Sequence, residues 1–543
     1  MGRLRKESYK QEKDKVIMRT KQLFKIHLLS FAALCTMALA AVSCASEDVA
    51  QNGKDTDNDK NFTEFVGGRP ETRTTMDYNS GAFYWEAGDK IYVQDDDNVW
   101  QVSNNAPTGK VASFKFKVPG KFTAKASYKV YYPGKNGTDN NVTIPATQNQ
   151  AEPNSTAHFG VSGDCGTADA ARANKFHFTL EHQAAILVFQ PYTDSGLSSC
   201  YVSKIEVSSD NNIAGSYTLS PGTGNLTGTG SGKQIILNIT GSGAYADGFP
   251  LVNGSANVAV NGSYMLISPG VHTLRVRYWV KDNVTNVEGI ITKALPSFNY
   301  DKNTFYDLEA LLVKNFSGSE YYMWDAQKSY WYGHEWNASN PTNRHQPTTN
   351  GINNANYPQS KITDLNRWYN DSNPGRNLWV NAQTDHFKSL PNVNEMAWYC
   401  KKGDPHWDAD ILWATMGHLY KGAMWFKKKN KISGFNDTVS PDGQDYRTTS
   451  NYLVCENSTI INSVPSASEI NDYFFLPALG HYNQGTMNYF GIIGTYWSST
   501  AVGVDAPGTV DNTPSGLGLG FKNNRVWVFI DYRYFGARIE SFE

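Results

Sequence analysis

The stretch TLRVRYWV at residues 273–280 alternates polar and apolar side chains with the two-residue period of a half-buried β-strand. Short alternating or apolar runs also lie at residues 90–94, 112–118, 128–132, 184–190 and 234–239, separated by Pro-Gly, Asn-Gly and Gly-Ser-Gly breaks. Many short strands bounded by turn residues are typical of antiparallel β-sandwiches. Because about 250 residues is too long for one small sandwich, we predict two in tandem, over residues 62–172 and 173–315.

Residues 316–543 have a different character, because tryptophan is concentrated there. Asn394 is a suitable N-cap for a helix that continues through Tyr399. We predict a second helix over residues 408–421, with Asp408 and Asp410 favouring its N-terminus and three apolar side chains on one face: Leu412, Met416 and Leu419. Since long loops and short strands fill the remainder, we expect an α+β domain.

The beginning of the chain has the order of a secretory signal. Basic residues around position 20 precede an apolar run at residues 28–41, and small residues lead into Cys44. The apolar run is shorter than the roughly 20 residues that span a bilayer as a helix. We therefore expect residues 1–43 to be a lipoprotein signal peptide with its true start at Met18, and Cys44 to carry a diacylglyceryl group and palmitate. An uncleaved membrane anchor is the disfavoured alternative.

Charge and cysteine content exclude several classes of function. Residues 1–43 carry a net charge of +6 and the whole chain −2, which leaves −8 for the remainder. A chain this acidic lacks the electrostatic footprint of a nucleic-acid-binding protein. Residues 44–61 are polar and are expected to form a disordered tether. No C-x-x-C pair is present, so we expect no metal site. Of the remaining cysteines, Cys400 and Cys455 are the better candidates for a disulfide in an exported chain.

The first part of the chain resembles the fimbrillin family of lipoprotein-derived (type V) pilus subunits. The resemblance lies in the order and spacing of five short motifs: TRT at residues 72–74, WEAGDKIYV at 85–93, YYP at 131–133, IPATQ at 144–148 and HQAA at 182–185. It implies two transthyretin-like sandwiches in series. It also implies a lipoprotein of the outer membrane surface, and acidic residues directly after Cys44 resemble the surface-export signal of such proteins.

The same resemblance implies a maturation step. Family pilins are cut after an arginine in the segment that precedes the first strong strand, and here Arg69 and Arg73 occupy that segment. The cut would remove the lipid and the first strand, and a strand from a neighbouring subunit would then fill the groove by β-augmentation. The alternative is an uncut lipoprotein in which both arginines are ordinary surface residues.

The last part resembles a C-type-lectin-like domain of the group related to formylglycine-generating folds. The clearest match is GTYWSST at residues 494–500, accompanied by LPALG at 476–480, KGDP at 402–405 and GLGF at 518–521. The resemblance does not by itself imply sugar binding. If the domain has a ligand site, we expect it on the long loops, where we consider four candidates: Trp331, Trp336, Asp505 and Asp511. Because Cys400 falls in a predicted helix and Cys455 in an apolar segment, we favour a structural role for this pair over redox catalysis.

These observations lead to a non-enzymatic interpretation without cofactors, since no P-loop, H-E-x-x-H or G-x-S-x-G motif is present. The leading hypothesis is a cell-surface fimbrial subunit at the tip or in an accessory position, whose partners are other pilus subunits and a glycan or protein ligand. The alternative is a non-polymerising outer-membrane lipoprotein that binds such ligands. An enzyme of the formylglycine-generating type is a third, disfavoured class.

Overall fold

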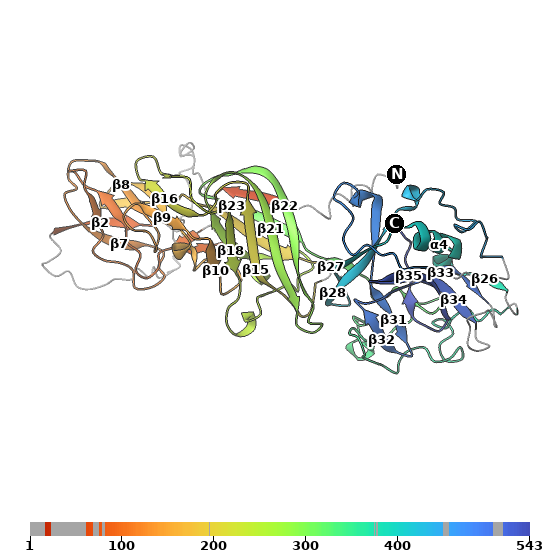
Figure 1. Ribbon diagram of the computed structural model, residues 1–543. Helices are drawn as coiled ribbons and strands as arrows, with labels where there is room; N and C mark the ends of the chain where they lie inside the picture. Colours follow the sequence, from red (N-terminus) through yellow and green to blue (C-terminus); the bar gives the residue numbers. More distant parts are fainter. Residues whose placement is uncertain are drawn as a thin grey trace, which may run out of the picture. The chain divides into compact units, whose positions relative to one another are not determined.

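The computed structural model describes residues 17–22, 61–68, 75–78, 82–194, 196–373, 375, 378–448, 455–502 and 514–543. It confirms a mostly β protein built from several sheets (Figure 1). The chain divides into two compact units, and the second consists mainly of residues 313–543. This division lies close to residue 316, where the sequence predicts the last domain to begin.

The first sandwich is formed by one large and one small sheet. The large sheet has the order β6 (Trp100–Val102), β5 (Tyr92–Gln94), β8 (Ser127–Tyr132), β11 (Gly166–Arg172), β12 (Phe176–Phe178), β2 (Phe62–Gly67) and β7 (Phe114–Pro119), with β13 (Glu181–His182) paired to β11. The small sheet contains β17 (Asn225–Thr227), β16 (Gly215–Ser220) and β9 (Asn141–Ile144). Tyr131, Val142 and Leu219 form one buried cluster that joins the two sheets.

The second sandwich also pairs two sheets. One has the order β1 (Ile17–Gln22), β23 (Thr304–Leu311), β14 (Ala185–Tyr192) and β20 (Ser263–Ile267). The other contains β10 (Thr147–Asn149), β18 (Gln234–Asn238), β15 (Cys200–Ser209), β21 (Gly270–Asp282) and β22 (Glu288–Tyr300), with β19 (Phe249–Pro250) beside β15. Phe189 and Tyr278 meet edge to face across the core, which places the sheets face to face.

The structure corrects the boundary expected between residues 172 and 173. That position falls in the turn of the β11–β12 hairpin, whose strands lie in one sheet. Strands are also exchanged between the two halves, because β10 pairs with β18 and β16 pairs with β9. Strand pairing over long sequence distances leaves no local signal, so a linear division of the sequence could not detect this exchange. All six runs predicted to be strands do coincide with strands, and residues 273–280 lie within β21.

The C-terminal unit contains two main sheets. The smaller has the order β24 (Lys314–Phe316), β27 (His406–Thr415), β28 (His418–Lys427) and β30 (Tyr473–Pro477). The larger has the order β25 (Tyr321–Tyr322), β36 (Ala537–Arg538), β33 (Gly494–Val502), β34 (Ser515–Lys522), β35 (Arg525–Tyr532) and β29 (Cys455–Asn457). Three further strands attach to it: β26 (Trp379–Asn381), β31 (Leu479–Asn483) and β32 (Thr486–Phe490).

Helices are short throughout the described residues. They are α2 (Val258–Asn261), α3 (Asp385–Lys388) and α4 (Val393–Lys402). The predicted helix near Asn394 is confirmed as α4, but its N-cap is Asn392, which forms a capping box with Glu395. Asn394 is instead buried and hydrogen-bonds the carbonyl of Thr438 and the carboxylate of Asp445. Within the described residues, no helix is long and apolar enough to cross a bilayer.

The helix predicted over residues 408–421 is wrong. The segment forms the antiparallel hairpin β27–β28, closed by the pair Thr415 and His418. The turn between them consists of Met416 and Gly417, which have φ values of 50° and 79°. Two central residues with positive φ define the turn that matches the twist of a two-residue hairpin. The helical spacing of apolar residues was therefore coincidental.

Candidate functional site

Strand β2 occupies an interior position in the first sandwich. It runs parallel to β12 on one side and antiparallel to β7 on the other, so both of its edges are hydrogen-bonded. Phe65 begins the pairing with β12, opposite Phe176, and lies within the pairing with β7, opposite Phe116. Removal of β2 would open a slot one strand wide between β12 and β7.

The side chains of β2 show what such a slot would accept. Phe65 is fully buried and its ring packs on Phe176, with centroids 4.9 Å apart, and on Phe122 at 5.0 Å. Two residues along the same face, Gly67 leaves no room for a side chain: a Cβ would lie 2.7 Å from Cζ of Phe178. A strand that replaces β2 therefore needs a large apolar residue at the position of Phe65 and glycine at the position of Gly67.

The candidate cleavage residues Arg69 and Arg73 lie outside the described residues. Their place along the chain is nonetheless informative, because they fall between β2 and the hairpin β3 (Thr75–Asp77) and β4 (Ala82–Tyr84). A cut after either arginine would separate β2 from everything that follows.

The chain after these arginines is held by the second sandwich. The Tyr78 hydroxyl donates a 2.9 Å hydrogen bond to Asp307 of β23. Burial, reinforced by Asp307, raises the pKa of Tyr78 to about 12. Phe83 is buried in one cluster with Ile186 of β14 and Phe305 of β23, two strands of that sandwich. Its ring also stacks on His182 of β13 at 3.9 Å, and Nδ1 of His182 lies 2.7 Å from the Asp164 carboxylate. These contacts do not involve β2, so they can persist without it.

A second strand position lies at the edge of the other sandwich. Strand β1 pairs antiparallel with β23 over six residues, from Ile17 opposite Glu309 to Gln22 opposite Thr304. Strand β1 belongs to residues 1–43, the segment expected to be a signal peptide. Without it, β23 would be an open sheet edge, which is a template for pairing with another strand. The sequence contains no signal from which this pairing could have been predicted.

The structure corrects one candidate of the ligand loops. Trp331 is only 1% exposed, and its ring packs against Tyr330 and Tyr482 in the core of the C-terminal unit. It cannot stack on a ligand, because hydrophobic packing has already covered it. Trp336 is half-buried and packs beside Gly318 and Gly417. Asp505 and Asp511 lie outside the described residues.

Cys400 of α4 and Cys455 of β29 are both buried thiols. A hydrogen bond to Cys455, together with burial, raises the pKa of Cys400 far above its ordinary value. Low-pKa, accessible thiolates are the reactive form of cysteine, so this environment does not suit redox catalysis. The two side chains interact directly, which supports the predicted disulfide between them. The disulfide itself stays a prediction, because both residues are free thiols here.

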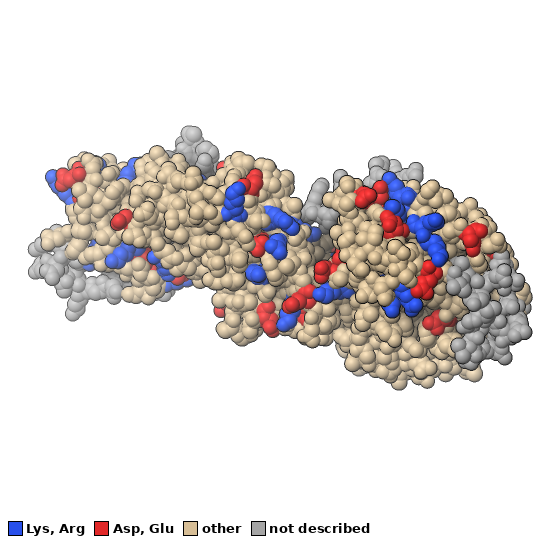
Figure 2. Space-filling model, viewed as in Figure 1, with Lys and Arg blue, Asp and Glu red and all other residues tan. Residues whose placement is uncertain are grey.

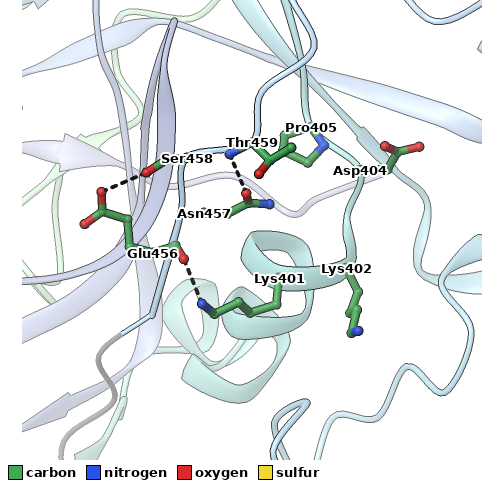
Figure 3. A pocket seen from close by; sticks show the side chains of 8 residues that line it. All are labelled: Lys401, Lys402, Asp404, Pro405, Glu456, Asn457, Ser458 and Thr459. Atoms are coloured by element: carbon green, nitrogen blue, oxygen red, sulfur yellow. Dashed lines mark hydrogen bonds between the residues drawn. The ribbon is translucent and has the colours of Figure 1, made fainter.

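A polar hollow of about 510 Å³ lies where the end of α4 meets the chain after β29 (Figure 3). Figure 3 shows Lys401 directed at the backbone oxygen of Glu456, a contact of 2.7 Å. Asp404 is paired with Lys427 at 2.8 Å. Of the charged side chains that line the hollow, Lys401, Asp404 and Glu456 thus have partners in the protein, which does not favour a preformed site for a charged ligand. Among the described residues, no three His, Cys, Asp or Glu side chains are grouped as metal ligands.

No protein-family model matches the chain, and no curated protein matches it. It is similar to the solved structure of a candidate cell adhesion protein from Bacteroides ovatus, with 15% identity and a TM-score of 0.27 over 44% of this chain and 88% of that one. The fimbrial anchor protein Mfa2 from Porphyromonas gingivalis matches with 12% identity and a TM-score of 0.21, over 43% and 83%. A fimbrial protein from Bacteroides ovatus matches with 12% identity and a TM-score of 0.22, over 49% and 52%. All three likenesses are distant.

Proposed function

We propose that this chain is a cell-surface fimbrial subunit in a tip or accessory position, exported as a lipoprotein through Cys44 and assembled by accepting a strand from a neighbour. The observation that carries the proposal is the place of β2, an interior strand that lies just before Arg69 and Arg73. A cut there exposes two unpaired edges and an aromatic pocket, which a donor strand can fill by β-augmentation.

The energetic case rests on the same strand. A donor would restore backbone hydrogen bonds to both β12 and β7, and burying one phenylalanine contributes about 1.5–3 kcal/mol. Glycine two residues after that phenylalanine then serves as a specificity element, because any larger residue clashes with Phe178. The proposed partner is thus a pilus subunit whose donor strand has this pattern.

The C-terminal unit supports an accepting rather than a donating role. Strand β36 pairs with β25 and β33, and Phe542 is buried against Tyr399. The last described residue, Glu543, accepts a hydrogen bond from the Tyr399 hydroxyl. These residues are bound within their own unit and are not a free donor strand. We therefore assign the chain an accepting role in a tip or accessory position, where the C-terminal unit can reach ligands.

N-terminal sequencing of protein released from the outer membrane tests the maturation step. The proposal expects a start after Arg69 or Arg73, and the variant with both Arg69→Ala and Arg73→Ala should keep the lipid and fail to co-purify with a stalk subunit. Arg344→Ala, at an exposed site elsewhere, is the matched control. A wild-type chain that keeps lipidated Cys44 at its N-terminus would favour the non-polymerising surface lipoprotein instead.

A further inference from the structure

Two segments of the C-terminal unit meet beside the β31–β32 hairpin. The backbone of Tyr482 in β31 exchanges two hydrogen bonds of 2.8 Å with Gly536, which follows β35. This pairing places residues 532–535 next to the outward side of β31, on which His481 and Asn483 alternate with the inward Tyr482. Tyr482 packs on the buried ring of Trp331, so the hydrophobic core of the unit supports both segments.

Five aromatic side chains gather on this surface, and we refer to them as the aromatic face: His481, Tyr489, Tyr532, Tyr534 and Phe535. Tyr532 and Tyr534 are parallel at 5.0 Å, and His481 is parallel to Phe535 at 5.4 Å. Tyr534 meets Phe535 at 5.2 Å, and Tyr489 lies 5.6 Å from His481. All five are at least partly exposed, and Tyr489 is 48% exposed. An aromatic surface of this kind is not the usual exterior of a packed domain.

Uncharged polar groups accompany these rings. Asn488 of β32 lies opposite His481, and Thr486 lies opposite Asn483. The Asn483 Oδ1 atom is buried and has no hydrogen-bond partner among the described residues. Burial lowers the pKa of His481 to about 4, so its imidazole is neutral at pH 7. In Figure 2 the lower margin of the C-terminal unit, where Figure 1 draws β32, carries no charged side chain.

We propose that the aromatic face binds the pyranose rings of a neutral glycan. Tyrosine presents a flat apolar ring with a polar edge, which suits the C–H face and hydroxyl rim of a sugar. Amide groups such as Asn483 supply the few placed polar contacts that orient a ligand. The aromatic face and the polar residues beside it contain no charged side chain, whereas an anionic sugar would require one; we therefore propose a neutral sugar.

This inference rests on the proposed adhesive function and names its ligand class. It differs from the loop site expected around Trp331 and Trp336, because Trp331 supports the aromatic face from the core instead of contacting the ligand. The sequence signal is Tyr532-Arg533-Tyr534-Phe535, whose aromatic residues flank a fully buried arginine. Only the pairing of Gly536 with Tyr482 brings them beside His481.

The test measures binding of the full mature chain to an immobilised panel of neutral oligosaccharides of glucose, galactose, mannose and xylose. We expect at least one member to bind, and Tyr534→Ala to weaken that binding about tenfold or more, equivalent to about 1.4 kcal/mol. Tyr534→Phe should retain it, because the ring remains. Tyr489→Gly is a second variant with little folding risk, since the φ of 63° at this position suits glycine. It should also weaken binding.

Tyr245→Ala, on a half-buried tyrosine of the other unit, is the control and should bind as the wild type does. The inference is overturned if the wild type binds no member of the panel, if the Tyr534 and Tyr489 variants bind unchanged, or if they lose binding only to a protein. Co-purification with a stalk subunit is measured in parallel. Variants of the aromatic face should leave it intact, so failure of the glycan site and failure of strand acceptance give different results.

Discussion

At the scale of single residues, Arg533 shows how one side chain organises the loops of the C-terminal unit. It is fully buried over the Trp324 ring and donates to four backbone carbonyls, those of Asn370, Ser372, Val502 and Ser515. Val502 and Ser515 flank residues 503–513, and Asn370 and Ser372 belong to another loop. Burial lowers the pKa of Arg533 to about 10. The planar guanidinium serves these acceptors at once, which an ammonium group cannot do.

Arg533→Lys should therefore destabilise the C-terminal unit by about 1–3 kcal/mol, because the three donors of an ammonium group leave at least one of the four buried carbonyls without a donor. Calorimetry on the full chain measures the change in the transition of that unit. Arg344→Lys at an exposed position is the matched control and should change stability by less than about 0.5 kcal/mol. Equal effects of both substitutions would contradict the role assigned to Arg533.

Asp531 gives a prediction about pH. Burial raises the pKa of its carboxyl to about 6. Since the folded-state pKa lies above the unfolded value of about 3.9, this group favours folding most below pH 4 and loses that contribution as pH rises through 6. The contribution is at most about 3 kcal/mol, from roughly two pKa units. Asp531→Asn should flatten the dependence of unfolding free energy between pH 4 and 7, and an unchanged slope would exclude Asp531 as its source.

At the scale of elements, the same kind of signal predicted strands well and one helix poorly. Residues 184–190 are a continuous apolar run that becomes β14, buried between β23 and β20. Residues 408–421 also carry apolar side chains at helical spacing, yet they form β27 and β28. The spacing of apolar residues cannot reveal the turn at Met416 and Gly417. The positive φ angles of these two residues end β27 and start β28, so the segment forms a hairpin instead of a helix. Turn chemistry should therefore outweigh periodicity when the two disagree.

Strand β2 supplies the prediction at this scale. After cleavage at Arg69 or Arg73, a peptide with the sequence of residues 61–68 should compete with the donor strand for the slot. A Phe65→Ala peptide should bind more weakly by about 3–5 kcal/mol, and a Gly67→Val peptide should not bind, because its side chain meets Phe178 and Trp85. Fluorescence anisotropy of labelled peptides measures this. A Thr63→Ser peptide is the conservative control, and equal affinities for all four peptides would exclude β2 as the exchanged strand.

At the scale of the whole molecule, the proposed export would determine the redox chemistry available to the cysteines of the chain. Disulfides persist outside the cytoplasm, and Cys400 and Cys455 interact directly between α4 and β29. We predict that secreted protein contains this bond, and that reducing it lowers the unfolding free energy of the C-terminal unit by up to about 4 kcal/mol. Mass spectrometry of unreduced peptides identifies the bond. Complete alkylation of both thiols in unfolded, unreduced protein would refute it.

Much of the architecture follows from the amino-acid sequence alone. Alternation and turn residues predict a mostly β chain, the tryptophan-rich region marks the second unit, and the residues around Cys44 predict export. These signals are local, since they depend on neighbours within about ten positions. The exchange of β10 and β16 between sandwiches, the interior place of β2, the burial of Trp331 and the aromatic face depend on the tertiary structure. Each of these features brings together residues that are far apart in the chain. Packing and strand pairing in three dimensions decide which of their side chains are in contact and which are buried.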